Sequence, residues 1–148
     1  MSSKIGAGVL GGLAGTLAML IVFSAAFYLG GIAFNYAASL GGWVIPRAAM
    51  MARFWVGAGI ALAIGAITGL IFGAVFPVRA ATSVGILYGA VWWLIAGLVL
   101  PAFGVMSAFW RLGPGVVAIS LVAYMLFGGL TGYLVELTAR RRVGTSTS

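Results

Sequence analysis

The sequence predicts an all-α integral membrane protein, a bundle of four transmembrane helices, and three observations predict it. First, 64% of the 148 residues are hydrophobic, 6% are charged, and the mean hydropathy is +1.22. Such a chain has too little polar surface to cover a water-soluble globule of this size. Second, four uncharged runs are each long enough to cross about 30 Å of hydrocarbon as a helix. Third, the runs lack the polar and apolar alternation of β-barrel strands.

The four runs form one transmembrane domain, residues 1–148, with spans at about 8–30, 54–76, 83–103 and 115–137. The first run follows Lys4 and contains "FSAA" at 23–26, features that are also found in secretory signal peptides. Its apolar stretch is longer than the roughly 7 to 15 residues of a signal, so we expect a retained helix.

The connections between the spans differ in character. The second, "PVRAATS" at 77–83, is expected to be a short turn, with Pro77 ending the preceding helix. The first, residues 31–53, is unusually apolar, and Arg47 and Arg53 are its only charges. A segment of this composition should not stay in water. We expect either an interfacial amphipathic helix, broken by Pro46, or a surface that another protein covers.

The basic residues predict the orientation, because Lys and Arg near span ends tend to stay on the cytoplasmic side. With both termini in the cytoplasm, five of the eight basic residues lie inside and three outside. The inside group is Lys4, Arg79, Arg140, Arg141 and Arg142, and the outside group is Arg47, Arg53 and Arg111. The triplet at 140–142 either only anchors the last span or also binds anionic lipid headgroups.

Small residues recur at every fourth position in all four spans. Lipid tails are as apolar as leucine, so helices in a bilayer associate through close packing, which glycine permits. The sequence favours contacts within the bundle and leaves open contacts between chains. The glycines expected at helix contacts are Gly12, Gly15, Gly65, Gly69, Gly73, Gly85, Gly89, Gly128 and Gly132.

Two of the spans share a short motif. "GAITG" at 65–69 aligns with "GGLTG" at 128–132, and this alignment matches Thr68 with Thr131. The first and third spans match more loosely, with "GGLAG" at 11–15 against "GILYG" at 85–89. The matches indicate either two helical hairpins in the same orientation, as in parallel-repeat membrane proteins, or the general similarity of apolar glycine-rich helices.

Three segments carry a resemblance to a known family: "GGLAGTLAML" at 11–20, "GILYGAVWWLIAGLVLPAFG" at 85–104 and "LFGGLTGYLVEL" at 126–137. They cover about a third of the chain and resemble small four-span prokaryotic membrane proteins of the YagU-like kind. The resemblance implies a bacterial or archaeal four-helix membrane protein and carries over no catalytic residue. The histidines often found before the second span and within the fourth in that family are absent here.

The residue types of common catalytic and metal sites are scarce. The chain has no Cys and no His, so disulfides, thiolate chemistry and the usual ligands of haem, zinc or copper are missing. Glu136 is the only acid. It is either a proton-relay candidate or, four residues before Arg140, one partner of an ion pair on the helix surface. No nucleophile with a base can be assembled, so we expect no enzyme and no cofactor.

Aromatic residues form two groups. Trp43, Trp55, Phe109 and Trp110 are expected on the outer side, as an interfacial belt or as a surface on which a partner docks. Trp92 and Trp93, with Tyr88 one turn earlier, are expected near the bilayer centre. They either pack against glycine faces or contact a pigment, quinone or haem held by a neighbouring subunit.

These observations favour a noncatalytic accessory subunit of a larger membrane complex, respiratory or otherwise energy-transducing. Its expected partners are the lipid bilayer and other integral-membrane subunits. The alternative is a small channel or transporter that acts as a homo-oligomer, although the spans lack a polar path. Nucleic acid is not an expected partner, because the basic residues are scattered over both sides of the membrane.

Overall fold

The structure, a computed structural model, describes residues 2–77 and 80–145, and describes side chains for 4–77 and 80–140. Within these ranges it contains helices and no strand. The elements are α1 (Ser2–Tyr28), α2 (Tyr36–Val44), α3 (Met50–Val75), α4 (Ala81–Ala102), the 3₁₀ turn η1 (Phe109–Arg111) and α5 (Pro114–Thr145). Helices α1, α3, α4 and α5 are long and apolar enough to cross a membrane. The chain is therefore a multi-pass membrane protein with a bundle of transmembrane helices, as the sequence predicts.

The helix ends follow local backbone rules. Helix α1 ends before Gly30, whose φ of +76° is left-handed, and the N–H of Gly31 donates to the Ala26 carbonyl (2.8 Å). Helix α5 begins with Pro114, whose missing N–H costs nothing at a first helical position. Both α1 and α5 extend beyond the expected spans, α1 back to Ser2 and α5 on to Thr145.

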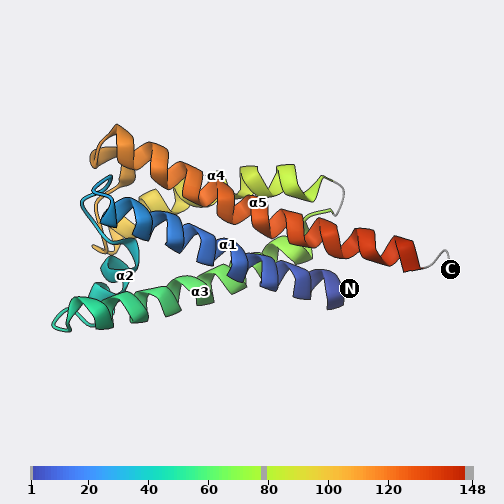
Figure 1. Cartoon of the computed structure of the whole chain (residues 1–148), viewed down its shortest axis with the longest axis horizontal. Coiled ribbons are helices and arrows are strands. Elements are labelled where there is room, and N and C mark those ends of the chain that lie inside the picture. Colours follow the sequence, from blue (N-terminus) through green and yellow to red (C-terminus); the bar gives the residue numbers. More distant parts are fainter. Residues whose placement is uncertain (1, 78–79, 146–148) are drawn as a thin grey trace.

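Helices α1 and α5 are the best-packed of the four long helices. Helix α1 packs along α3 and along α5, and α4 packs along α5. Helices α3 and α4 are also neighbours, but they meet through side chains and their backbones do not pack closely along each other. Figure 1 shows both chain termini at one end of the bundle, here called the terminal end, and α2 at the opposite end, here called the α2 end.

The first connection contains the expected short helix, α2, and it ends just before Pro46. Asn35 caps it, because its side-chain oxygen accepts a hydrogen bond from the N–H of Ala38 (3.0 Å). The helix does not only lie on the surface. It packs against the first turns of α3, where Gly41 lies against the backbone of Arg53. Its buried residues are Tyr36, Ala37, Leu40 and Gly41.

The main buried cluster lies in the half of the bundle near α2. It joins buried residues of every element except α4, including Phe23 of α1, Tyr36 of α2 and Phe109 of η1, and partly buried residues of α4 pack against it. A smaller cluster lies toward the terminal end, where Phe72 of α3 contacts Ala81 of α4 and Val135 of α5. Helix α2 and η1 therefore add large side chains to those of α1 and α5 in the interior at one end, and closely packed helices form the other.

Candidate functional site

The two hairpins, α1–α3 and α4–α5, are held by the same glycine contacts. At Gly12 of α1, a Cβ atom would overlap the carbonyl of Gly65 and press on the Cα of Gly69. The helices approach so closely because these side chains are missing. The same three contacts recur in the second hairpin, from Gly85 of α4 to Gly128 and Gly132 of α5.

The contacts fix the register of the internal repeat. Because Gly65 and Gly128 make equivalent contacts, the matched motifs at 65–69 and 128–132 occupy equivalent places. The looser match of the first and third spans is wrong by one residue. Gly12 is equivalent to Gly85, because both face the partner helix of their own hairpin, whereas Gly11 faces Thr131 of α5.

The other expected glycines also face the backbone of a neighbouring helix in the same chain. Gly73 lies against Lys4 and Gly8 of α1, and Gly89 lies against Tyr124 of α5. Gly15 lies against Phe127 of α5. Within the described residues, all nine of the expected glycines therefore contribute to the packing of this one chain.

The hairpins join along a closed seam between α1 and α5. Here the backbone of Gly11 meets that of Thr131, and Gly15 meets Phe127 one turn away. The Thr131 hydroxyl donates to the Phe127 carbonyl of its own helix (2.8 Å), so it forms no bridge between helices. The seam is held by close backbone packing.

The equivalent seam between α3 and α4 is open. In the register fixed above, Val84 and Tyr88 of α4 stand where α1 has Gly11 and Gly15. The Tyr88 hydroxyl crosses to α3 and donates to the Thr68 carbonyl (2.7 Å). Its ring also packs against Phe72, with ring centroids 5.1 Å apart. We interpret Tyr88 as the residue that holds α3 and α4 apart. A glycine at this position would let the two helices approach more closely.

This separation leaves an apolar groove of about 130 Å³, here called the α3–α4 groove. Its mouth lies on the outside of the bundle, because Ile64 of α3 and Ile95 and Val99 of α4 line it and are 47%, 37% and 42% exposed. The other lining residues are Thr16, Met19, Tyr36, Leu40, Ala61, Gly65, Thr68, Trp92, Ala96, Leu100, Tyr124 and Phe127.

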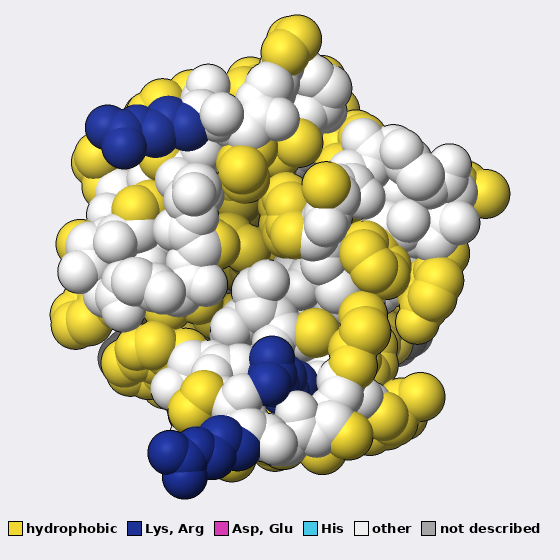
Figure 2. Space-filling view, turned by 90° about the vertical axis from the view of Figure 1, so that its left-hand side faces the viewer, with side chains coloured by type: hydrophobic (Ala, Val, Ile, Leu, Met, Phe, Trp, Pro, Cys, Tyr) yellow, Lys and Arg dark blue, Asp and Glu magenta, His cyan; other side chains and the backbone are white. Residues whose placement is uncertain are grey.

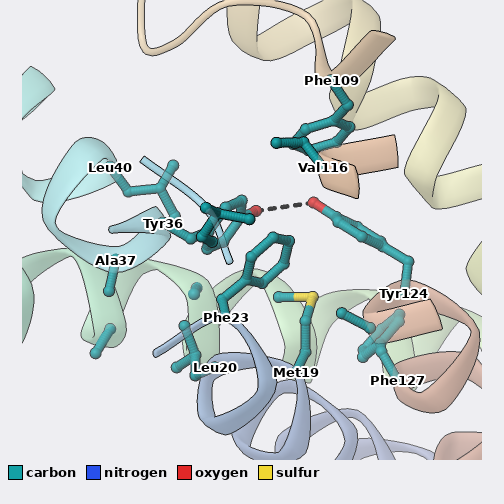
Figure 3. Packing of buried hydrophobic residues seen from close by; sticks show 14 residues of the cluster. Met19, Leu20, Phe23, Tyr36, Ala37, Leu40, Phe109, Val116, Tyr124 and Phe127 are labelled. Carbon is teal, nitrogen blue, oxygen red and sulfur yellow. Dashed lines mark hydrogen bonds between the residues drawn. The ribbon is translucent and has the colours of Figure 1, made fainter. Parts of the chain in front are cut away.

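Two tyrosines meet in the interior beside the groove. The hydroxyls of Tyr36, from α2, and Tyr124, from α5, share a hydrogen bond of 2.8 Å (Figure 3). The Tyr36 ring stacks on Phe23 of α1, with centroids 4.6 Å apart. Each hydroxyl thus satisfies the other in an apolar surrounding, and the pair ties α2 to the bundle.

The outer aromatic residues do not form one surface. Trp43, Trp55 and Trp110 are exposed as expected for a rim. Phe109 is not: its side chain is 1% exposed, and its ring stacks on Trp93 at 6.2 Å. The prediction that Phe109 docks a partner is therefore wrong, because η1 turns this ring into the core and leaves Trp110 outside.

The only acid lies at the terminal end, away from the groove. Glu136 pairs with Arg140 (2.5 Å), as its spacing predicts, and accepts a hydrogen bond from the Thr82 hydroxyl of α4 (2.8 Å). The carboxylate thus links α4 to α5. The side chains of Arg141 and Arg142, and the whole of Arg79, lie outside the described residues, so their lipid and topology roles stay predictions.

A second, more polar cavity of about 500 Å³ opens at the α2 end. Arg53 lines it, but its Nε donates to the Ala48 carbonyl (2.8 Å) and its Nη2 bonds the Pro46 carbonyl. The guanidinium therefore fixes the link between α2 and α3. This use of its donors makes the cavity a weaker candidate than the groove.

No protein-family model, curated protein or solved structure matches the chain. The α3–α4 groove is the candidate functional site on its geometry. Sequence reasoning placed Tyr88 and Trp92 near the bilayer centre and missed the groove. The sequence did contain a signal for the groove, because the internal repeat places Tyr88 where the first hairpin has Gly15. The motif match of the first and third spans was one residue out of register, so it did not align these two positions.

Proposed function

We propose that the chain is a noncatalytic accessory subunit of a larger membrane assembly, of a respiratory or other energy-transducing kind. The tight packing of the helices supports a scaffolding role, because four of the helix pairs meet backbone to backbone. The single acid is engaged with Arg140 and Thr82, which supports a structural use for it. The resemblance to YagU-like proteins supports a prokaryotic source.

One observation carries this proposal: the apolar surface of the α2 end. Figure 2 views the molecule from this end, where hydrophobic side chains lie around the rim among a few basic ones. They lie at helix ends and in connections, beyond the middle of the spans where lipid tails are expected. Exposed apolar surface of this kind is typical of protein contacts. Its residues are Tyr28, Leu29, Trp43, Val44, Met50, Met51, Trp55, Phe103 and Trp110.

Purification of the tagged chain from its native membrane in a mild detergent tests the proposal. We expect it to migrate with at least one other integral-membrane protein in a fixed ratio. The double variant Leu29→Ala/Trp43→Ala should lose this partner, because both side chains are exposed at the α2 end. Leu94→Ala, on the exposed face of α4 nearer its middle, is the control and should retain it.

A wild-type chain that migrates alone in every mild detergent would contradict the accessory role. Solute flux in liposomes that contain only this protein would instead support the channel or transporter alternative. The close helix contacts predict tight vesicles, because a path would have to run between copies of the chain.

The proposed location is the prokaryotic plasma membrane, with both termini in the cytoplasm. Two features support this orientation: both termini lie at one end of the bundle (Figure 1), and the triplet that contains Arg140 follows there. Because the chain has no cysteine, single-cysteine variants test it cleanly. An impermeant maleimide should label Ala48→Cys in intact cells and Ser3→Cys only after permeabilisation, and the reverse pattern would contradict the orientation.

A further inference from the structure

We propose that the α3–α4 groove binds the terminal segment of an acyl chain of a membrane lipid. This inference does not depend on the accessory role proposed above. It follows from four properties of the groove: its mouth, its depth in the membrane, the chemistry of its walls and its size.

The mouth opens toward the bilayer. Ile64, Ile95 and Val99 line the groove and are also part of the exposed apolar faces of α3 and α4. The groove is therefore continuous with a surface that contacts lipid, and lipid tails are the molecules adjacent to it. No rearrangement of a helix is needed for a chain to enter from the side.

The deeper part of the groove lies at the depth of the ends of lipid tails. Ile64 lies fourteen residues after Met50 and eleven before Val75, the bounds of α3. At a rise of about 1.5 Å per residue, it is more than about 15 Å from either end of the helix. Half the hydrocarbon thickness is also about 15 Å, so headgroups cannot reach the level of Ile64 and chain ends can. From there the mouth continues toward the α2 end along Ile95 and Val99.

The walls offer packing without a need for hydrogen bonds. Most lining residues are aliphatic or aromatic, and the Tyr36 and Tyr124 hydroxyls bond each other at 2.8 Å. The Thr68 hydroxyl donates to the Gly65 carbonyl of its own helix (3.1 Å). A polar ligand would lose its hydration and find few free hydrogen-bonding groups in the groove. A hydrocarbon chain has no hydrogen bonds to lose.

The size and the closed ends select a short, slender ligand. An apolar cavity of about 150 Å³ accepts benzene, so about 130 Å³ accommodates a segment of about six carbons. A helix, about 10 Å across with its side chains, is too wide to enter. Tyr36 and Leu40 of α2 line the groove at one end. Toward the other end Thr68 lines it, and the Thr68 carbonyl accepts the hydrogen bond of the Tyr88 hydroxyl.

Two buried residues distinguish a bound chain from bulk lipid. Tyr124 and Phe127 line the groove and are only 6% and 4% exposed. Lipid on the outer surface reaches Val91, which is 52% exposed at the middle of α4, but does not reach these two rings. A chain end inside the groove would touch them.

The experiment uses the whole protein in phosphatidylcholine vesicles that carry a photoreactive diazirine on one acyl chain. The diazirine is placed either at the terminal carbons or near the carboxyl end, and adducts are mapped by mass spectrometry after illumination. We expect the terminal probe to label Tyr124 and Phe127 in addition to Val91. The probe near the carboxyl end should leave both buried rings unlabelled.

Filling the groove should abolish this labelling. Ala61→Leu of α3 and Ala96→Leu of α4 each extend a side chain into it from opposite walls. Either should reduce adducts on Tyr124 and Phe127 by about tenfold, the factor expected when about two methylene groups lose their burial. The matched control Ala63→Leu, on the exposed face of α3, should leave labelling unchanged.

Three results would overturn the proposal. The first is that the terminal probe does not label the buried rings, or that both probes label them equally. Another is labelling that persists in folded variants with a filled groove. The third is displacement by an isoprenoid quinone but not by excess unlabelled phosphatidylcholine, which would assign the groove to an isoprenoid tail. If both variants fail to fold, the comparison of the two probes on the wild-type protein still decides.

Discussion

The two seams that join the hairpins involve equivalent positions of the repeat, but one seam is closed and the other is open. Between α1 and α5, Gly11 and Gly15 let the backbones touch, and no space remains. Between α3 and α4, Val84 and Tyr88 stand at the equivalent places, and a groove of about 130 Å³ opens. The comparison indicates that the residues at two helix positions determine whether a repeated membrane interface closes or leaves a ligand-sized space.

The largest expected loss of stability comes from breaking the glycine contact within a hairpin, because both seams depend on intact hairpins. Gly69→Leu places a side chain onto the backbone of Gly8 and Gly12. We expect the free energy of unfolding in mixed micelles to fall by about 3 kcal/mol or more, since overpacking against backbone has no easy relief. A Cβ atom at Gly59 in the same helix would meet no atom within 4 Å, so Gly59→Leu serves as the control. Equal stability of the two variants would contradict the glycine packing.

Converting the closed seam into an open one should have the next largest effect. Gly15→Tyr introduces the residue that α4 carries at the equivalent position, here against the Phe127 backbone. We expect a loss of about 1 to 3 kcal/mol and a longer distance between spin labels placed on α1 and α5. An unchanged distance between the labels would show that Tyr88 is not what holds the other seam open.

The tyrosine pair tests how the α2 end of the groove is held. Tyr36→Phe or Tyr124→Phe leaves one buried hydroxyl without its partner and should cost about 1 to 3 kcal/mol in unfolding free energy. The double variant removes both hydroxyls and should be close to wild type. A double-mutant cycle of unfolding titrations measures this coupling. Simple additivity of the two losses would show that the pair does not act as a unit.

The smallest expected effect concerns the hydrogen bond across the open seam. Tyr88→Phe removes the bond to the Thr68 carbonyl but keeps the ring that separates α3 from α4. Polar contacts between membrane helices contribute about 0.6 kcal/mol on average, so the loss should be of that order. The groove should persist, as judged by lipid labelling of Phe127. Collapse of the groove would assign the separation to the bond and not to the ring.

The sequence was sufficient for the helical class, the four spans and the glycines at the contacts, because these depend on hydropathy and on small-residue spacing. It could not place Phe109, because a 3₁₀ turn of three residues decides whether Phe109 or Trp110 faces inward. The sequence also could not predict the α3–α4 groove. That space depends on which faces of α3 and α4 are opposed, and a short motif match does not fix a helix rotation to within one residue.

The seam between α1 and α5 joins the first span of the chain to the last. Each hairpin can pair as soon as its second helix is in the membrane, but Gly11 and Gly15 have no protein neighbour until α5 has been synthesised. During biosynthesis the first hairpin must therefore wait with a glycine face turned to lipid. Translation that stops before the last span would leave this face uncovered, which makes it a natural target for membrane chaperones and quality-control proteases.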